Sequence, residues 1–103
     1  MLTILRYEIN QAINDIELPC DARILNVGLT KDECGVEKIS VWCEVDVDND
    51  KNYAPLPLCT NVVRFVVFGT GANMDSIARF NRKYIGTVQK SNMYAFHVYV
   101  VNY

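Results

Sequence analysis

The sequence has few residues that break regular structure and lacks the segments that direct a chain to a membrane. Its 103 residues include only 5 glycines and 3 prolines, whereas 50% are hydrophobic and 21% charged. This composition excludes intrinsic disorder and the collagen-like and low-complexity classes. No apolar run approaches the roughly 18 residues of a membrane helix, and no basic region precedes the short apolar start of the chain, as a secretory signal would require. We therefore expect a soluble, cytosolic protein with a single domain spanning residues 1–103.

Closely spaced cysteines are also absent, and there is one histidine. Cys20, Cys34, Cys43 and Cys59 are separated by 14, 9 and 16 positions, with no C-x-x-C motif. Structural zinc sites normally use a close pair of ligands, and a reducing cytosol disfavours disulfides. We expect no metal and no other cofactor, and four free thiols, most of them buried.

Acidic residues are scarce in the second half of the chain. Residues 1–50 carry 4 basic and 11 acidic side chains, a balance of −7, whereas residues 51–103 carry 6 basic and 1 acidic, a balance of +5. Such an asymmetry can steer anionic ligands or support head-to-tail self-association. The alternative is that the two halves fold against each other and their charges lie mixed in solvent.

What is present is a period-2 pattern of apolar residues. Residues 39–47 alternate between an apolar set and the polar set of Ser40, Glu44 and Asp46, with Trp42 among the latter, as in a half-buried antiparallel strand. Residues 23–29 repeat the pattern, and residues 2–9 and 13–18 suggest an opening hairpin. Further strands are predicted at 61–68, 84–88 and 94–101.

Two segments interrupt this rhythm. Residues 48–60 contain Asp, Asn and two prolines and are typical of an exposed loop. Residues 73–83 are predicted to form one short helix, capped by Asn73 or Asp75, or a loop insertion. The pattern as a whole predicts a mainly β fold, a small antiparallel β-sandwich or barrel of six to seven strands.

Gly69-Thr70-Gly71 follows a predicted strand and precedes the predicted helix. Two glycines allow backbone amides to turn toward an anion, and a helix N-terminus would add positive potential. The alternative is a glycine-supported exit from the strand. Because Arg79, Arg82 and Lys83 come soon after, this segment is the best candidate in the sequence for an anionic contact surface.

The other motifs give weaker indications of a functional site. Asp46-x-Asp48-x-Asp50 begins like a calcium loop, but the sixth and twelfth positions are Lys51 and Pro57 instead of Gly and Glu. Trp42, on the polar face of its strand, is either covered by the fold or a second subunit or offered to a ligand as a stacking platform. His97 lies within a predicted strand with no nucleophile assigned to it, so we interpret it as structural.

Several sequence segments, in their order along the chain, resemble a family of short uncharacterised proteins of tailed bacteriophages. The family is classified as a domain of unknown function. The matching segments are Ile4-Leu5-Arg6-Tyr7-Glu8-Ile9, Ile16-Glu17-Leu18-Pro19, residues 22–28, residues 41–46, Arg64-Phe65-Val66-Val67-Phe68-Gly69-Thr70-Gly71, residues 84–88 and Phe96-His97-Val98-Tyr99. Family members usually carry a histidine directly after Gly-Thr-Gly, where this chain has Ala72, and the segments 30–37, 49–60 and 73–82 are longer than usual. The resemblance implies a phage origin and the host cytoplasm.

These features suggest three functions. We expect first a non-enzymatic accessory protein that counters a host defence, by occluding a host protein or by sequestering a small anionic, nucleotide-like ligand. Such a protein would form a homo-oligomer and would not bind nucleic acid, given its negative net charge. The predicted contact residues are Gly69, Thr70, Gly71, Arg79, Arg82 and Lys83, with Trp42. The alternatives are a virion-assembly protein, or a phosphoester hydrolase that pairs His97 with Glu44 or Asp46.

Overall fold

The computed structural model describes residues 1–46, 60–90 and 94–102, and these form seven strands and one short 3₁₀ turn. The predicted loop at 48–60, which includes Cys59, falls outside the described residues except for Thr60. Val47 also falls outside them. The elements are β1 (Leu2–Ile9), β2 (Ile13–Pro19), β3 (Arg23–Lys31), β4 (Glu37–Asp46), β5 (Thr60–Gly69), η1 (Asp75–Ile77), β6 (Asn81–Gln89) and β7 (Ala95–Asn102).

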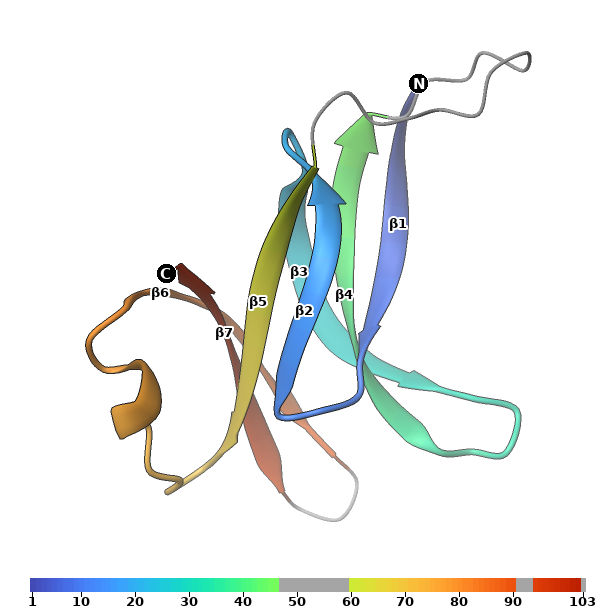
Figure 1. Ribbon diagram of the computed structural model, residues 1–103. Helices are drawn as coiled ribbons and strands as arrows, with labels where there is room; N and C mark the ends of the chain where they lie inside the picture. Colours follow the sequence, from blue (N-terminus) through green and yellow to red (C-terminus); the bar gives the residue numbers. More distant parts are fainter. Residues whose placement is uncertain (47–59, 91–93, 103) are drawn as a thin grey trace.

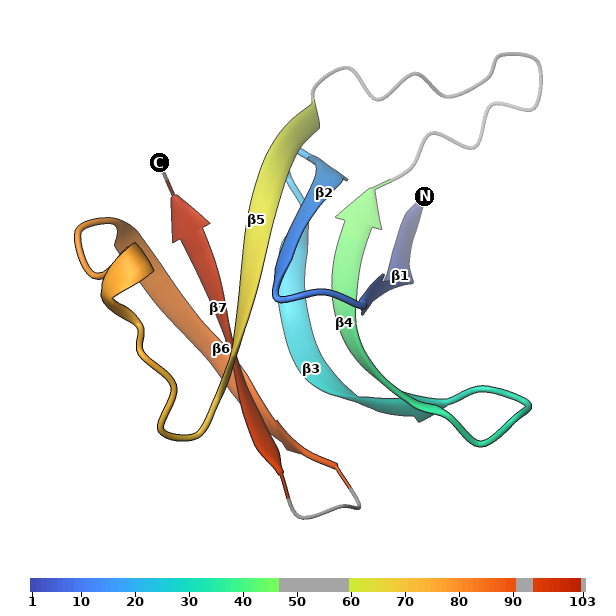
Figure 2. The ribbon, with the colours of Figure 1, turned by 60° about the horizontal axis from the view of Figure 1, so that its bottom comes forward.

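The strands form two antiparallel sheets packed face to face (Figures 1 and 2). Sheet A has the order β1-β4-β3, and sheet B has the order β2-β5-β7-β6. The predicted mainly β sandwich of six to seven strands is confirmed. The edge strands are β1 and β3 in sheet A and β2 and β6 in sheet B. An additional strand from a partner could pair only at such an edge.

The predicted opening hairpin is wrong, because β1 and β2 lie in different sheets. β1 pairs with β4, whereas β2 pairs with β5, and residues 10–12 cross between the sheets (Figure 1). The amide of Val67 donates to the carbonyl of Ala12 at 2.9 Å, which joins the crossing segment to sheet B. Period-2 alternation shows which face of a strand is buried, but two successive strands can either pair or face each other across the core.

The core lies between the inner faces of the two sheets. The apolar positions of β4 are almost fully buried there: Val41, Cys43 and Val45 are at most 1% exposed. From sheet B, Phe65 of β5 and Val98 of β7 are equally buried. The alternation in residues 39–46 therefore places these apolar side chains inside and Ser40, Trp42 and Glu44 on the outer face of sheet A.

One side of the sandwich is closed by a contact between edge strands β3 and β6. Both strands are irregular there, with a change of register between Ile24 and Asn26 in β3 and between Tyr84 and Gly86 in β6. A Cβ atom at Gly86 would lie 2.4 Å from Cγ1 of Val27, closer than such atoms can approach. Glycine at position 86 is thus what allows the two sheets to meet along this edge.

The segment 73–83 is mostly a loop with one 3₁₀ turn, and its last three residues already belong to β6. The predicted cap at Asn73 or Asp75 is wrong, because the residue at the N-cap of the turn is Met74, which makes no side-chain cap hydrogen bond. The side-chain oxygen of Asn73 accepts a hydrogen bond from the amide of Asp75 at 2.8 Å just before the turn. The segment crosses the outer face of sheet B (Figure 2). There Ile77 is 4% exposed and forms a second apolar cluster; its members are Val66, Val101, Phe68, Met74 and Tyr99.

The cysteines differ from the expectation of four free thiols. Cys20 is disulfide-bonded, whereas Cys34 is a free, exposed thiol and Cys43 a free, buried one. Spacing along the sequence excluded a zinc site but gave no information on which side chains come within bonding distance in space.

Candidate functional site

The Gly69-Thr70-Gly71 segment forms a tight exit from β5. The amide of Thr70 donates to the carbonyl of Ala95 at 3.2 Å, and the amide of Ala72 donates to the carbonyl of Gly69 at 3.0 Å. Gly71 has a φ of +84°, which a side chain would strain. The amide of Thr70, and that of Ala72 directly after the segment, are therefore bonded within the protein, and η1 is a three-residue turn, not a helix that could add positive potential.

Thr70 contributes its side chain to a hydrogen-bonded row around His97. Thr70 Oγ1 lies 2.8 Å from His97 Nε2, and Thr87 Oγ1 lies 2.9 Å from His97 Nδ1. The hydroxyl of Tyr84 in turn is hydrogen-bonded to Thr87 Oγ1. A threonine hydroxyl can donate or accept, so either neutral tautomer of the imidazole is satisfied at both nitrogens. This geometry fits the structural role that we expected for His97.

The pairing of His97 with Glu44 or Asp46 that a hydrolase would need does not form. His97 lies on the outer face of sheet B with Tyr99 and Phe68, whose rings lie 6.3 Å apart. Glu44 and Asp46 belong to β4 in sheet A, where Glu44 lies on the opposite outer face of the sandwich. Because packed sheets are about 10 Å apart, neither carboxylate can take a proton from His97 directly.

Arg82, one of the predicted basic residues, lies far from the glycine turn. Gly69 pairs with Phe96 of β7, but Arg82 pairs with Val101, so the two positions are about 16 Å apart along the strand. Nη1 of Arg82 donates to the carbonyl of Ala78 at 3.1 Å. The η1 segment and its apolar cluster lie between these two places.

Trp42 lies on the other sheet altogether. A Cβ at Gly28 would approach its indole to 3.3 Å, so the ring packs over that glycine on the outer face of sheet A. Ser40 beside it is fully buried and shares a hydrogen bond with Thr30. Trp42 thus lies on sheet A, whereas the other six predicted contact residues lie on sheet B or in the segment that joins β5 to β6, so no small ligand can touch all seven.

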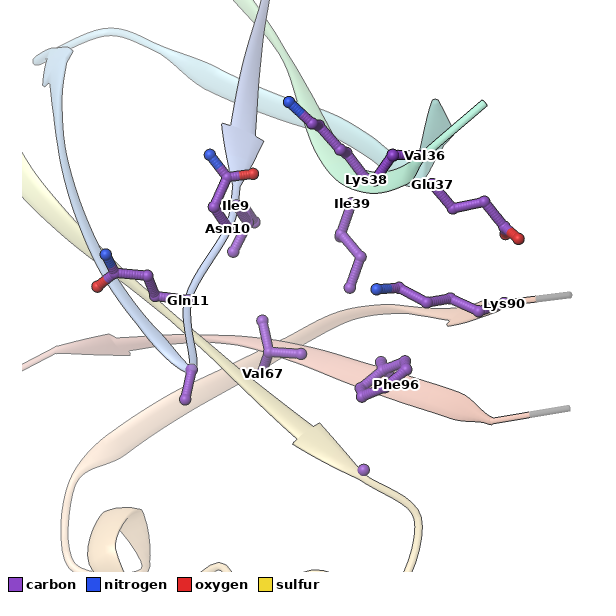
Figure 3. A pocket seen from close by; sticks show the side chains of 12 residues that line it. Ile9, Asn10, Gln11, Val36, Glu37, Lys38, Ile39, Val67, Lys90 and Phe96 are labelled. Carbon is purple, nitrogen blue, oxygen red and sulfur yellow. The ribbon is translucent and has the colours of Figure 1, made fainter. Parts of the chain in front are cut away.

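A cavity between the two sheets was not predicted from the sequence. It lies between the two sheets at the end where β1 crosses to β2, and its volume is about 440 Å³ (Figure 3). Among the predicted site residues only Gly69 belongs to it. The lining residues are Ile9, Asn10, Gln11, Ala12, Val36, Glu37, Lys38, Ile39, Val67, Gly69, Lys90 and Phe96.

A second unpredicted feature is the exposure of apolar side chains on edge strand β1. Leu2 and Ile4 are 66% and 57% exposed on the outer face of sheet A, and Leu5 is 40% exposed on the inner face. β1 has a single neighbouring strand, β4, in the part of the chain that the structure describes. A sequence pattern could not reveal this exposure, because the same residues in a central strand would be buried.

Perturbed pKa values fall outside the predicted site. The side-chain hydrogen bonds from Arg64 lower the pKa of Asp15, which accepts from Nε at 2.7 Å and from Nη2 at 2.8 Å. Burial raises the pKa of the Cys43 thiol. Burial, followed by the nearby Cys43, raises the pKa of Tyr7. None of the three shifts prepares a nucleophile or a base, since such a group needs its pKa brought toward neutrality in a cleft.

Residues 1–46, 60–90 and 94–102 contain no cluster of three His, Cys, Asp or Glu side chains that could hold a metal ion. Within the same residues no helix has the length and apolar character needed to cross a membrane.

A family model described as a domain of unknown function, DUF7352, matches residues 1–103 of the chain. The comparisons with curated proteins and with solved structures gave no match.

Proposed function

Because the chain belongs to the DUF7352 family, whose function is unknown, kinship assigns no activity, and we propose that the protein is a non-enzymatic accessory binding protein. On this proposal it is encoded by a phage, acts in the host cytoplasm and counters a host defence by occluding a host protein. The observation that carries the proposal is the apolar, exposed edge strand β1.

β1 has the properties of a strand that accepts a partner. It is eight residues long and regularly paired with β4 along its whole length. No other strand of the described residues pairs with it, so its other edge presents backbone donors and acceptors in register. Natural edge strands are usually protected by charge, proline or a bulge. The first half of β1 carries Leu2, Ile4 and Leu5 instead, and its charged residues, Arg6 and Glu8, come later.

The fitting partner is an extended protein segment with apolar side chains, which would add to sheet A as a fourth strand. Main-chain hydrogen bonds would supply affinity, and contacts with Leu2 and Ile4 would supply specificity. The outer face adjoining these residues holds Trp42, a residue type enriched where binding energy concentrates. The virion-assembly alternative would use the same edge, but the protein would then be found in purified particles.

The test is native mass spectrometry on tagged protein purified from its infected bacterial host. Ile4→Glu places a charge in the proposed contact. Val62→Glu is the matched control, because Val62 is 69% exposed on sheet B. Substitutions at such exposed positions change stability little, so both variants should fold.

We expect a stoichiometric host protein with the wild type and with Val62→Glu, and its loss with Ile4→Glu. A complex that survives Ile4→Glu contradicts the assignment to β1. A homodimer abolished by Ile4→Glu would show that a second copy occupies β1, and bare protein in every sample would contradict the proposal as a whole.

A further inference from the structure

We propose that the cavity at the open end of the sandwich is a binding site for an anionic amphiphile with a single alkyl chain. This site shares no residue with the contact proposed at Leu2 and Ile4 of β1.

The floor of the cavity is apolar and continuous with the core. Ile9 and Ile39 from sheet A are 3% and 5% exposed, and both belong to the main core cluster. Val67 and Phe96 from sheet B pack against the same cluster. Figure 3 shows these four side chains pointing into the space between the sheets. A cavity with such a floor takes up an alkyl chain because the chain's apolar surface leaves water.

Gly69 keeps the cavity open on the side of sheet B. It pairs directly with Phe96 and follows Val67 by two residues, so its missing side chain would share their face and lie in the cavity. A Cβ there would meet no atom within 4 Å, and the backbone of Gly69 is not in the left-handed region. The cavity can therefore be filled from this position without disturbing the core.

The rim carries one ammonium group suited to an anionic head. The Nζ atom of Lys90 lies 5.2 Å from the centre of the Phe96 ring, and in Figure 3 it reaches between Ile39 and Phe96. Among the described residues, no ion pair within 4.0 Å includes Lys90. The cavity is also lined by Glu37, whose carboxylate points away from Lys90 Nζ in Figure 3. Lys38, by contrast, is already shared by Glu8 at 3.6 Å and Asp32 at 4.0 Å.

The opposite rim supplies neutral donors. Asn10 and Gln11, in the segment that crosses between the sheets, line the cavity, and within the described residues their carboxamides make no hydrogen bond. The carboxylate head would pair with Lys90 while its chain lies on the apolar floor. A single charged group at the rim and an apolar floor suit an amphiphile better than a nucleotide, because a nucleotide needs several contacts to its phosphates.

The first experiment is isothermal titration calorimetry with sodium decanoate as the probe. We expect binding of one decanoate per chain, and affinity at least about tenfold weaker for decyltrimethylammonium, since hydrogen bonds to charged groups contribute on this order. Acetate, which lacks the chain, should not bind. Vesicles of phosphatidylglycerol test a membrane source of the anion, and we expect no binding to them because their chains stay in the bilayer. Equal affinity for the cationic amphiphile, no decanoate binding, or vesicle binding would overturn the proposal.

Two variants locate the site. Lys90→Gln should weaken decanoate binding about tenfold, whereas Lys83→Gln, which removes the same charge from exposed Lys83 on β6, should leave it unchanged. Gly69→Leu should abolish binding by filling the cavity, with its melting temperature measured as a check of folding. If Gly69→Leu does not fold, Lys90→Gln and Lys83→Gln still test the location of the site. Equal effects of these two variants on decanoate affinity would contradict it.

Discussion

Individual side chains in this protein differ in reactivity because of their immediate surroundings, as the two free cysteines among the described residues illustrate. Cys34 lies exposed in the β3–β4 hairpin, whereas Cys43 lies fully buried at the centre of β4. Burial disfavours the charged thiolate and raises the pKa of Cys43. Since the thiolate is the nucleophile, the burial of Cys43 suppresses its chemistry.

We therefore predict selective alkylation by iodoacetamide in the native protein at neutral pH. Cys34 should be modified, and Cys43 should react only when the protein is unfolded. Peptide mass spectrometry after timed quenching measures both rates. Comparable rates for the two thiols would contradict the burial of Cys43.

The Asp15–Arg64 ion pair also links a single side chain to the fold, because it joins β2 to β5 across sheet B. The pKa of Asp15 is lowered in the folded protein. Its ionised form thus favours folding above the unfolded-state pKa, and this contribution is lost as the pH falls through the folded-state value. Both groups are partly solvated, so salt should weaken the effect.

An NMR titration of the side-chain carboxyl carbon should show a pKa for Asp15 below the ordinary value. Arg64→Gln should return the pKa toward that value, and the stability lost in this variant should be smaller in acid than at neutral pH. An unchanged Asp15 titration in Arg64→Gln would exclude the ion pair as the cause.

At the scale of elements, the contact between β3 and β6 depends on one missing side chain. Val27 is 7% exposed and its Cγ1 occupies the space into which a side chain at Gly86 would project. The 84–88 segment was predicted as a strand from its apolar residues, but the glycine within it had no evident role. Only the approach of β3 gives it one.

We expect Gly86→Ala to lower the free energy of unfolding by about 1–3 kcal/mol through overpacking. Adding Val27→Ala should recover part of this loss, so that the two substitutions are less than additive. Urea denaturation of the single and double variants measures the coupling. Gly69→Ala is the matched control and should change stability by less than about 0.5 kcal/mol, because its Cβ meets open space. Strict additivity would show that Gly86 and Val27 do not meet.

At the scale of the whole molecule, the strand order sets which parts can open. β4 has neighbours β1 and β3, and β5 and β7 likewise have a strand on each side. An edge strand is hydrogen-bonded to a single neighbouring strand, so local opening there requires less free energy than in a central strand. Both proposed contacts, the β1 edge and the cavity between the sheets, lie in regions where the molecule is incompletely closed.

Hydrogen exchange followed by NMR should therefore show the slowest amides in β4, β5 and β7. Amides of β1 that point away from β4 should exchange fast in the free protein and become protected when a partner strand is bound. Decanoate should leave these β1 amides unchanged, which separates the two proposals. Slower exchange in free β1 than in β4 would contradict the assignment of β1 as an open edge.

The sequence alone determined the mainly β class and most strand positions, because burial of one face per strand requires alternation at every second residue. It also determined which face of β4 is polar, and the resemblance to an uncharacterised family agrees with the family that the whole chain matches. Only the tertiary structure decided which strands pair, since β1 and β2 satisfy the same alternation in either sheet. It also separated Trp42 and Arg82 from Gly69-Thr70-Gly71, and brought Gly69 together with Phe96 and Lys90. Neighbours in sequence share a site only when the chain's path between sheets keeps them on one face, and local patterning does not specify that path.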